Sequence, residues 1–166
     1  HYHRTKSELA AHGVLVGDVK LDLSAMQARK EKIVATLTSG GDGLFRKNKI
    51  TRHFGHGRLE APGRVSVTGQ GGRTELEGRH ILIATGSWPV MPSIPGIEFA
   101  LDSNDFFFLP NLPERALVVG GGYIAVEFAG ILNNLGVDTT LSYRGELFLR
   151  SFDQDIRQHL RDALVA

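Results

Sequence analysis

Residues 116–127 read Ala-Leu-Val-Val-Gly-Gly-Gly-Tyr-Ile-Ala-Val-Glu, and this stretch decides the fold. A short apolar run of strand type ends at three consecutive glycines, and an apolar pattern of helical spacing starts directly behind them. The order predicts a β-strand, a tight turn and the N-terminus of an α-helix. Gly120, Gly122 and Ala125 fit the G-x-G-x-x-G/A pattern, in which the backbone approaches a pyrophosphate at a helix N-terminus.

The chain after this turn predicts the rest of a β-α-β unit. Tyr123 to Leu135 is apolar at helical spacing and ends at Gly136, a typical helix stop. Residues 137–143 then read as a second strand, and residues 153–166 show helical spacing again. We therefore expect an α/β fold in which the glycine turn follows the first strand of a dinucleotide-binding unit.

The residue that closes the second strand distinguishes NAD from NADP. An acidic side chain about 20 residues past the glycines accepts hydrogen bonds from the ribose 2′-hydroxyl of NAD. This chain has Tyr143 and Arg144 at that place, and Arg150 follows one short loop later. Arginine offers planar donors that match phosphate oxygens, so the pair predicts NADP(H), which carries a 2′-phosphate. The alternative is that both arginines are solvated surface residues.

A second group of strands is predicted ahead of the glycine turn, where the hydrophobic period is two. Turn signals at residues 61–63 and 70–73 separate the runs, which predict a small antiparallel meander. His80 to Ala84 is apolar after its first residue, and we expect it to be a buried strand. The alternating runs are residues 50–54, 58–60, 64–67 and 74–77.

The region before the meander is predicted to be helical. Ser24 and Gln27 form the pattern of a capping box, and an apolar helical pattern follows. Glycines at 40, 41 and 43 each cost about 1 kcal/mol of helix propensity, so we expect a break or a close packing contact there. A phosphate loop at these glycines is disfavoured, because no strand precedes them. The apolar positions are Met26, Ile33, Val34, Leu37, Leu44 and Phe45.

Residues 87–113 carry five of the six prolines and the only tryptophan, Trp88, and read as a linker between two sheets. Its phenylalanines are expected to be buried in the core. Stacking on nucleic-acid bases is the alternative, but no basic residues are interleaved among these aromatic side chains. The phenylalanines are Phe99, Phe106, Phe107 and Phe108.

The N-terminal residues indicate a helix end. Residues 7–13 read as the last turns of a helix closed by Gly13. His1, His3 and His12 could be imagined as metal ligands, but their spacing matches no usual site and no carboxylate cluster supports them. We expect no metal.

Composition excludes several classes of function. A formal net charge of +1 gives no reason to expect nucleic acid or a membrane surface as partner. No apolar run approaches the roughly 20 residues of a membrane span. The chain has 0 cysteines, so it holds neither disulfides nor thiolate chemistry itself. It begins at His1 and ends inside a helical pattern, so we expect a middle segment of a longer protein.

Four short segments together resemble the FAD-dependent pyridine-nucleotide–disulfide oxidoreductases, and the resemblance covers essentially the whole chain. From about residue 80 on, the chain is most similar to glutathione and trypanothione reductases. Before that point, residues 19–23, 44–49 and 55–58 look more like dihydrolipoamide dehydrogenase, which uses NAD. The four segments are residues 55–57 (Gly-His-Gly), 81–87 (Ile-Leu-Ile-Ala-Thr-Gly-Ser), 120–127 and 143–153.

The resemblance implies a partial FAD/NAD(P)-binding Rossmann-like fold with an antiparallel meander, truncated at both ends. Residues 1–103 would be the C-terminal part of the first FAD segment, and residues 104–166 the first half of the NADP(H)-binding domain. The residue matching Tyr123 lies over the flavin in those reductases, and the one matching Glu127 lies near the nicotinamide. FAD would contact Gly57, Thr85, Gly86 and Ser87. NADP would contact Gly120, Gly121, Gly122, Tyr123, Ile124, Ala125, Glu127, Arg144 and Arg150.

The resemblance also implies an activity for the complete enzyme. Hydride would pass from NADPH through FAD to a cysteine pair outside this chain, and then to a small disulfide such as glutathione disulfide. Such an enzyme is expected to be a cytoplasmic homodimer, and the segment alone is expected to be inactive. Two alternatives stay open: an NAD-linked dihydrolipoamide dehydrogenase, and a truncated nucleotide-binding module that only senses or binds partners.

Overall fold

The computed structural model describes Thr5 and residues 8–165, and the chain divides into two compact units. One unit comprises His1–Gln27 with Met91–Ala166, and the other comprises Ala28–Val90. Each contains one sheet: a parallel pair in the first and an antiparallel sheet of three strands in the second. The predicted α/β class with an antiparallel meander is confirmed. The predicted domain boundary at residue 103 remains a prediction.

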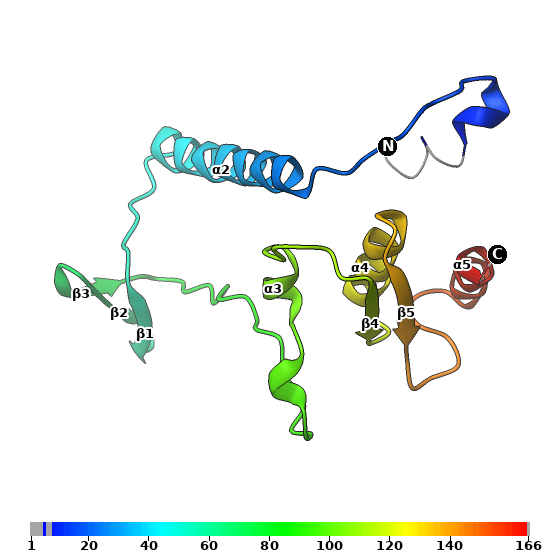
Figure 1. The fold of residues 1–166 in the computed structure, drawn as a ribbon. Helices are drawn as coiled ribbons and strands as arrows, with labels where there is room; N and C mark the ends of the chain where they lie inside the picture. The colour runs from blue at the N-terminus through cyan, green and yellow to red at the C-terminus, as the bar shows by residue number, and fades with distance from the viewer. Residues whose placement is uncertain (1–4, 6–7, 166) are drawn as a thin grey trace. The chain divides into compact units, whose positions relative to one another are not determined.

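The first unit is built on a β-α-β element that matches the prediction closely. Strand β4 (Arg115–Val119) leads through the glycines into helix α4 (Tyr123–Asn134), and β5 (Asp138–Ser142) returns parallel to β4. The strands pair in register from Arg115 with Asp138 to Val119 with Ser142. Helix α4 packs on both strands, and α5 (Gln154–Val165) follows β5 (Figure 1).

The end of α4 carries the tightest packing of this unit. Gly136 adopts a φ of 94°, a left-handed conformation that ends helices at glycine. Its N–H donates to the Asn133 carbonyl, and the Val137 N–H donates to the Leu132 carbonyl at 3.1 Å. Leu132 and Val137 are 5% and 4% exposed, so the chain is buried on both sides of this turn, directly before β5.

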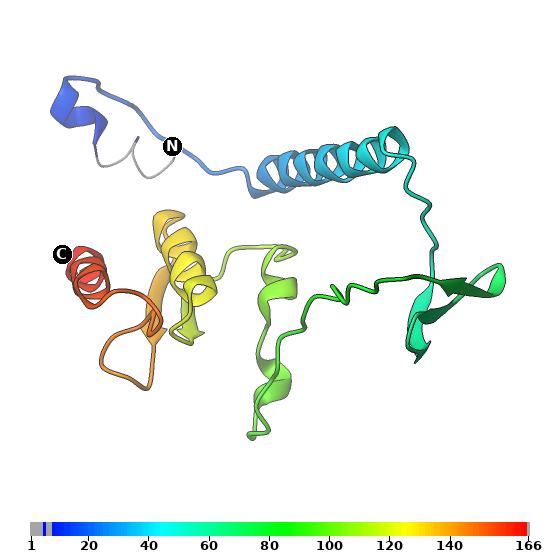
Figure 2. The same ribbon diagram turned by 180° about the vertical axis from the view of Figure 1, so that it is seen from behind.

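The second unit contains the predicted meander. Strands β1 (His56–Ala61), β2 (Arg64–Gly69) and β3 (Gly72–Glu77) pair antiparallel in the order β1-β2-β3 (Figure 2). The predicted strand over residues 50–54 is wrong. The Arg52 guanidinium lies 5.3 Å from the centre of the Phe45 ring and 4.4 Å from that of Phe54, and it pairs with Asp42. These local contacts take the place of a strand ladder.

A polar network crosses the meander at Ser66, the one buried polar side chain among the described residues. Ser66 is 2% exposed, and its hydroxyl donates to Glu60 Oε1 at 2.6 Å. Arg73 bonds the same oxygen at 3.1 Å and Glu75 at 3.0 Å. The Ser66 hydrogen bond, assisted by the arginine charges, lowers the pKa of Glu60 below its ordinary value despite partial burial. The network fastens the three strands to one another.

The predicted buried strand over His80 to Ala84 is also wrong. The described chain there is irregular, and Leu82 and Ile83 are 90% and 70% exposed. A strand requires a neighbour to bond its N–H and C=O groups, and no strand of the described residues pairs with this segment.

Helix α2 (Leu23–Lys47) corrects two further expectations, the capping box at Ser24 and the break or close contact at the glycines. It begins ahead of Ser24, and Asp22 rather than Ser24 accepts from a first-turn N–H, that of Ala25, at 2.9 Å. The helix continues through all three glycines, and a Cβ added at any of them would touch nothing within 4 Å. About 1 kcal/mol each is too little to break a helix of 25 residues. Its apolar side is exposed; Leu37 is 71% exposed.

The linker holds short helices and only part of the expected aromatic core. It contains η2 (Ile97–Phe99) and α3 (Ser103–Phe106), while η1 (Leu9–His12) and its Gly13 cap confirm the predicted helix end near the N-terminus. Phe106 stacks on Phe128 of α4 with ring centres 3.7 Å apart, and Phe107 meets both rings edge-on. Phe99, Phe107 and Phe108 are 85%, 47% and 72% exposed, so their predicted burial is wrong.

Candidate nucleotide-binding site

The glycine turn joins β4 to α4 in a conformation that depends on Gly120. Its φ is 145°, a region that residues with a side chain rarely adopt. Its N–H donates to the Ser142 carbonyl at 2.9 Å, which ties the end of β4 to the end of β5. A Cβ at Gly120 would lie 3.3 Å from the Ala125 Cβ, so the helix packs closely on the turn. The conformation and this close contact both favour glycine at position 120.

Gly122 leaves the N-terminus of α4 open. It is the N-cap residue, with φ −84° and ψ 173°, and no side-chain hydrogen bond caps the helix there. Gly122 is exposed, and a Cβ added to it would meet nothing within 4 Å. The first N–H groups of a helix have no intrahelical partner and attract anions. The turn therefore fits a pyrophosphate at Gly122, where the first N–H groups of the helix lie beside an α-carbon that no side chain covers.

Gly121 serves a different purpose, which the sequence pattern did not indicate. A Cβ at Gly121 would lie 2.5 Å from Tyr143 Cε2 and 2.6 Å from its Cγ. A Cβ at Gly145 would lie 2.8 Å from Cε1 of the same ring. The Tyr143 ring thus occupies the space that side chains at both glycines would need. It fixes the start of the loop after β5 against the glycine turn.

Arg144 and Arg150 lie at the two ends of that loop, and both are exposed. Between them Leu147 and Leu149 are each 8% exposed, which anchors the middle of the loop. In the described part of the chain, no hydrogen bond or ion pair joins either guanidinium to a protein group. Two free guanidinium groups on one loop beside an open helix N-terminus can receive a phosphate.

The remaining residues predicted to contact NADP lie in the first turns of α4. Tyr123 is 59% exposed, and Ile124 is 41% exposed. Ala125 is half-buried against Gly120, and Glu127 is exposed. The structure thus brings together all nine residues of the predicted NADP set, on the turn, on the start of α4 and on the adjacent loop.

The residues predicted to contact FAD are not brought together in the same way. Gly57 lies in β1 opposite Val67, while Thr85, Gly86 and Ser87 lie in the exposed segment after the sheet. Gly86 has a φ of 71°, and a Cβ added to it would meet nothing within 4 Å. All four are exposed, and they form no flavin cradle by themselves. Their role in FAD binding therefore rests on the resemblance alone.

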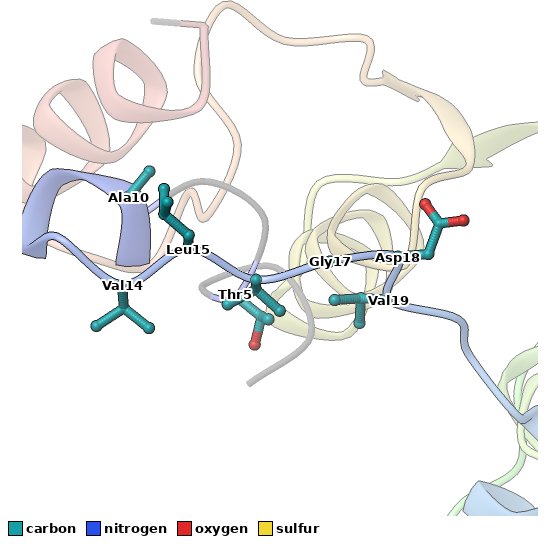
Figure 3. A pocket seen from close by; sticks show the side chains of 8 residues that line it. Thr5, Ala10, Val14, Leu15, Gly17, Asp18 and Val19 are labelled. Atoms are coloured by element: carbon teal, nitrogen blue, oxygen red, sulfur yellow. The ribbon is translucent and has the colours of Figure 1, made fainter.

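Two cavities in the first unit are lined by none of the residues predicted to contact NADP or FAD. One of about 310 Å³ is lined by Thr5 and the stretch around Val14–Val19, where Val14 and Leu15 point to opposite sides of the chain (Figure 3). The other, of about 410 Å³, lies between α4, β5 and α5 and includes Tyr143. Neither is lined by Arg144 or Arg150. The predicted site is a surface of backbone and loops rather than a closed pocket.

Two further findings concern other classes of site. Among the described residues no group of three His, Cys, Asp or Glu side chains is placed to hold a metal ion; His1 and His3 lie outside those residues. No helix in the described part of the chain is long and apolar enough to cross a membrane.

The glycine turn, the parallel β-α-β element and the meander define a nucleotide-binding α/β chain. The family model for pyridine nucleotide-disulphide oxidoreductases matches residues 4–166. The chain belongs to this family of oxidoreductases, whose members bind FAD and a pyridine nucleotide.

Curated relatives come from more than one branch of the family. The chain is 36% identical to the mitochondrial dihydrolipoyl dehydrogenase of Pisum sativum over 98% of its length. It is 40% identical to the trypanothione reductase of Trypanosoma congolense over 89% of its length, and 40% identical to the glutathione reductase of Burkholderia cepacia over 85%. It spans about a third of each relative, 33%, 32% and 30% respectively. The identities to these relatives do not distinguish NAD from NADP as the nucleotide of this chain.

Proposed function

We propose that the whole protein is an NADPH-dependent disulfide reductase whose best substrate is glutathione disulfide. The observation that carries this proposal is the pair of exposed guanidinium groups, Arg144 and Arg150, on the loop beside the glycine turn. NAD would require an acceptor for its ribose 2′-hydroxyl at the end of β5. Tyr143 fills that position with an aromatic ring packed on Gly121.

The residues of this chain would bind and orient the dinucleotide. The N-terminus of α4 holds the pyrophosphate through backbone N–H groups, and Gly122 lets it approach. Arg144 and Arg150 hold the 2′-phosphate by charge-assisted hydrogen bonds. On the first turns of the helix, Tyr123 then lies toward the flavin and Glu127 toward the nicotinamide. When bound, FAD supplies the redox relay between nicotinamide and a cysteine pair.

A dihydrolipoyl dehydrogenase is the second candidate, and a specific observation favours it. The Pisum sativum enzyme aligns with 98% of the chain, a larger share than the 85% that aligns with the glutathione reductase. We rank it second because its similarity includes residues 19–58, which lie outside the glycine turn and the arginine loop. A sensing or binding module without catalysis is a third candidate.

Several properties of the whole protein belong to the same proposal. Residues 1–103 form part of an FAD domain and residues 104–166 part of an NADP(H) domain. The reductase acts as a homodimer in the cytoplasm on a low-molecular-weight disulfide. Gly57 and residues 85–87 contact the flavin.

The proposal is tested by steady-state kinetics on the whole protein. We expect oxidation of NADPH with glutathione disulfide to be faster than oxidation of NADH with the same disulfide. We also expect little reduction of NAD⁺ by dihydrolipoamide. Rapid reduction of NAD⁺ by dihydrolipoamide would make the second candidate correct, and no turnover with any of these pairs would favour the third.

A further inference from the structure

The loop that carries Arg144 and Arg150 has almost no regular structure of its own. Residues 143–150 lie between β5 and α5 and contain no helix or strand. A phosphate site built on two loop side chains needs their backbone held in place, because ordering a free loop on binding costs conformational entropy. Two sets of contacts hold this loop.

One contact joins the loop to the glycine turn. The Leu149 N–H donates to the Gly121 carbonyl at 2.6 Å. Leu149 adopts a φ of 57°, a left-handed conformation that is unusual for a branched side chain, and its carbonyl accepts from Phe152 N–H at 2.8 Å. Such a backbone persists when its surroundings determine it.

A second contact comes from α5. Arg157 donates from Nε to the Phe148 carbonyl at 2.8 Å and from Nη2 to the Leu147 carbonyl at 2.5 Å. Its Nη1 bonds Gln154 Oε1 at 3.0 Å within the same helix. The guanidinium fork thus bridges two successive carbonyls midway between Arg144 and Arg150. A planar group with fixed donor directions restrains both peptides at once.

We propose that Arg157 is a positioning residue for the 2′-phosphate of NADP(H). It holds residues 147 and 148, and through them keeps Arg144 and Arg150 beside the glycine turn, without contributing a phosphate contact itself. This inference rests on the proposed NADPH function. It assigns to α5 a part in nucleotide selection that the exposed arginines alone do not reveal.

Direct binding to the whole protein tests this role apart from catalysis. Calorimetry would compare adenosine 2′,5′-bisphosphate with adenosine 5′-monophosphate as probes. Arg157→Ala should weaken binding of the bisphosphate roughly tenfold, equivalent to about 1.4 kcal/mol. It should change the affinity for the monophosphate by no more than about twofold. Arg157→Lys should restore only part of the loss, because one ammonium cannot reproduce the fork.

Arg161→Ala is the matched control. Arg161 lies one turn further along α5, and its guanidinium bonds only the neighbouring Asp162 among the described residues. The control should bind both probes as the wild type does. Suppose that the wild type binds the bisphosphate more tightly than the monophosphate. If Arg157→Ala then keeps the wild-type affinity for the bisphosphate, or loses affinity for both probes equally, the positioning role is wrong while the phosphate site stands. A wild type without preference would instead contradict the NADPH proposal.

Discussion

Replacing both Arg144 and Arg150 with alanine is expected to raise the KM for NADPH strongly and leave the KM for NADH nearly unchanged. Each lost charge-assisted contact to a phosphate should cost about 1.5–3 kcal/mol, or roughly ten- to a hundredfold in affinity. Neither guanidinium bonds a protein group in the described residues, so their removal should leave folding intact. Steady-state kinetics of the whole protein with both nucleotides measures the difference.

The control for this double variant is Arg161→Ala, which removes an exposed positive charge from α5. It should leave both KM values at the wild-type level. Equal increases for NADPH and NADH in the Arg144/Arg150 variant would mean that the arginines support the fold rather than the 2′-phosphate.

Gly121→Ala is expected to have the second large effect, and its cause is steric. The new Cβ would lie within 2.6 Å of the Tyr143 ring carbons, where ordinary contact begins near 3.4 Å. The ring or the turn must move, and overpacking of this kind typically costs about 1–3 kcal/mol. Chemical denaturation of the whole protein should show the loss of stability, and NADPH and NADH should both bind more weakly because the turn serves both.

A double-variant cycle separates this clash from a need for glycine as such. With Tyr143→Ala in place, the ring is gone, and adding Gly121→Ala should then cost much less than it does alone. Strict additivity of the two changes would refute the contact between ring and glycine as the cause.

The β4-α4-β5 element could be predicted closely because its determinants are local. Gly120 and Gly136 mark the turn and the helix end, and the partners of each strand lie a short distance away in sequence. The predicted strand over His80–Ala84 was wrong because its partner would not be local. An apolar run becomes a strand only beside another strand, and sequence alone does not indicate whether that neighbour is present.

The predicted break in helix α2 was wrong for a different reason. The glycines at 40, 41 and 43 each lower helix propensity. The helix has 25 residues, however, and its backbone hydrogen bonds on both sides of the glycines outweigh this small cost. Propensity is thus a weak guide inside a long helix, while the apolar spacing correctly predicted that a helix exists.

The candidate site was predicted in part. Gly122, Arg144 and Arg150 belong to a spacing pattern with a physical reason, so the sequence was sufficient to propose them. Arg157 gave no such signal, because its partners are the carbonyls of Leu147 and Phe148, and these exist as a pair of acceptors only in the folded loop. The packing of Tyr143 on Gly121 was equally hidden, since a glycine pattern does not say what fills the missing side chain's place.

The most direct test of the central claim is the affinity of the wild-type whole protein for two mononucleotide probes that differ by one phosphate. Calorimetry should show adenosine 2′,5′-bisphosphate binding at least roughly tenfold more tightly than adenosine 5′-monophosphate, with the preference decreasing as salt screens the arginines. Equal affinity for both probes, or a preference for the monophosphate, would contradict a 2′-phosphate site at Arg144 and Arg150.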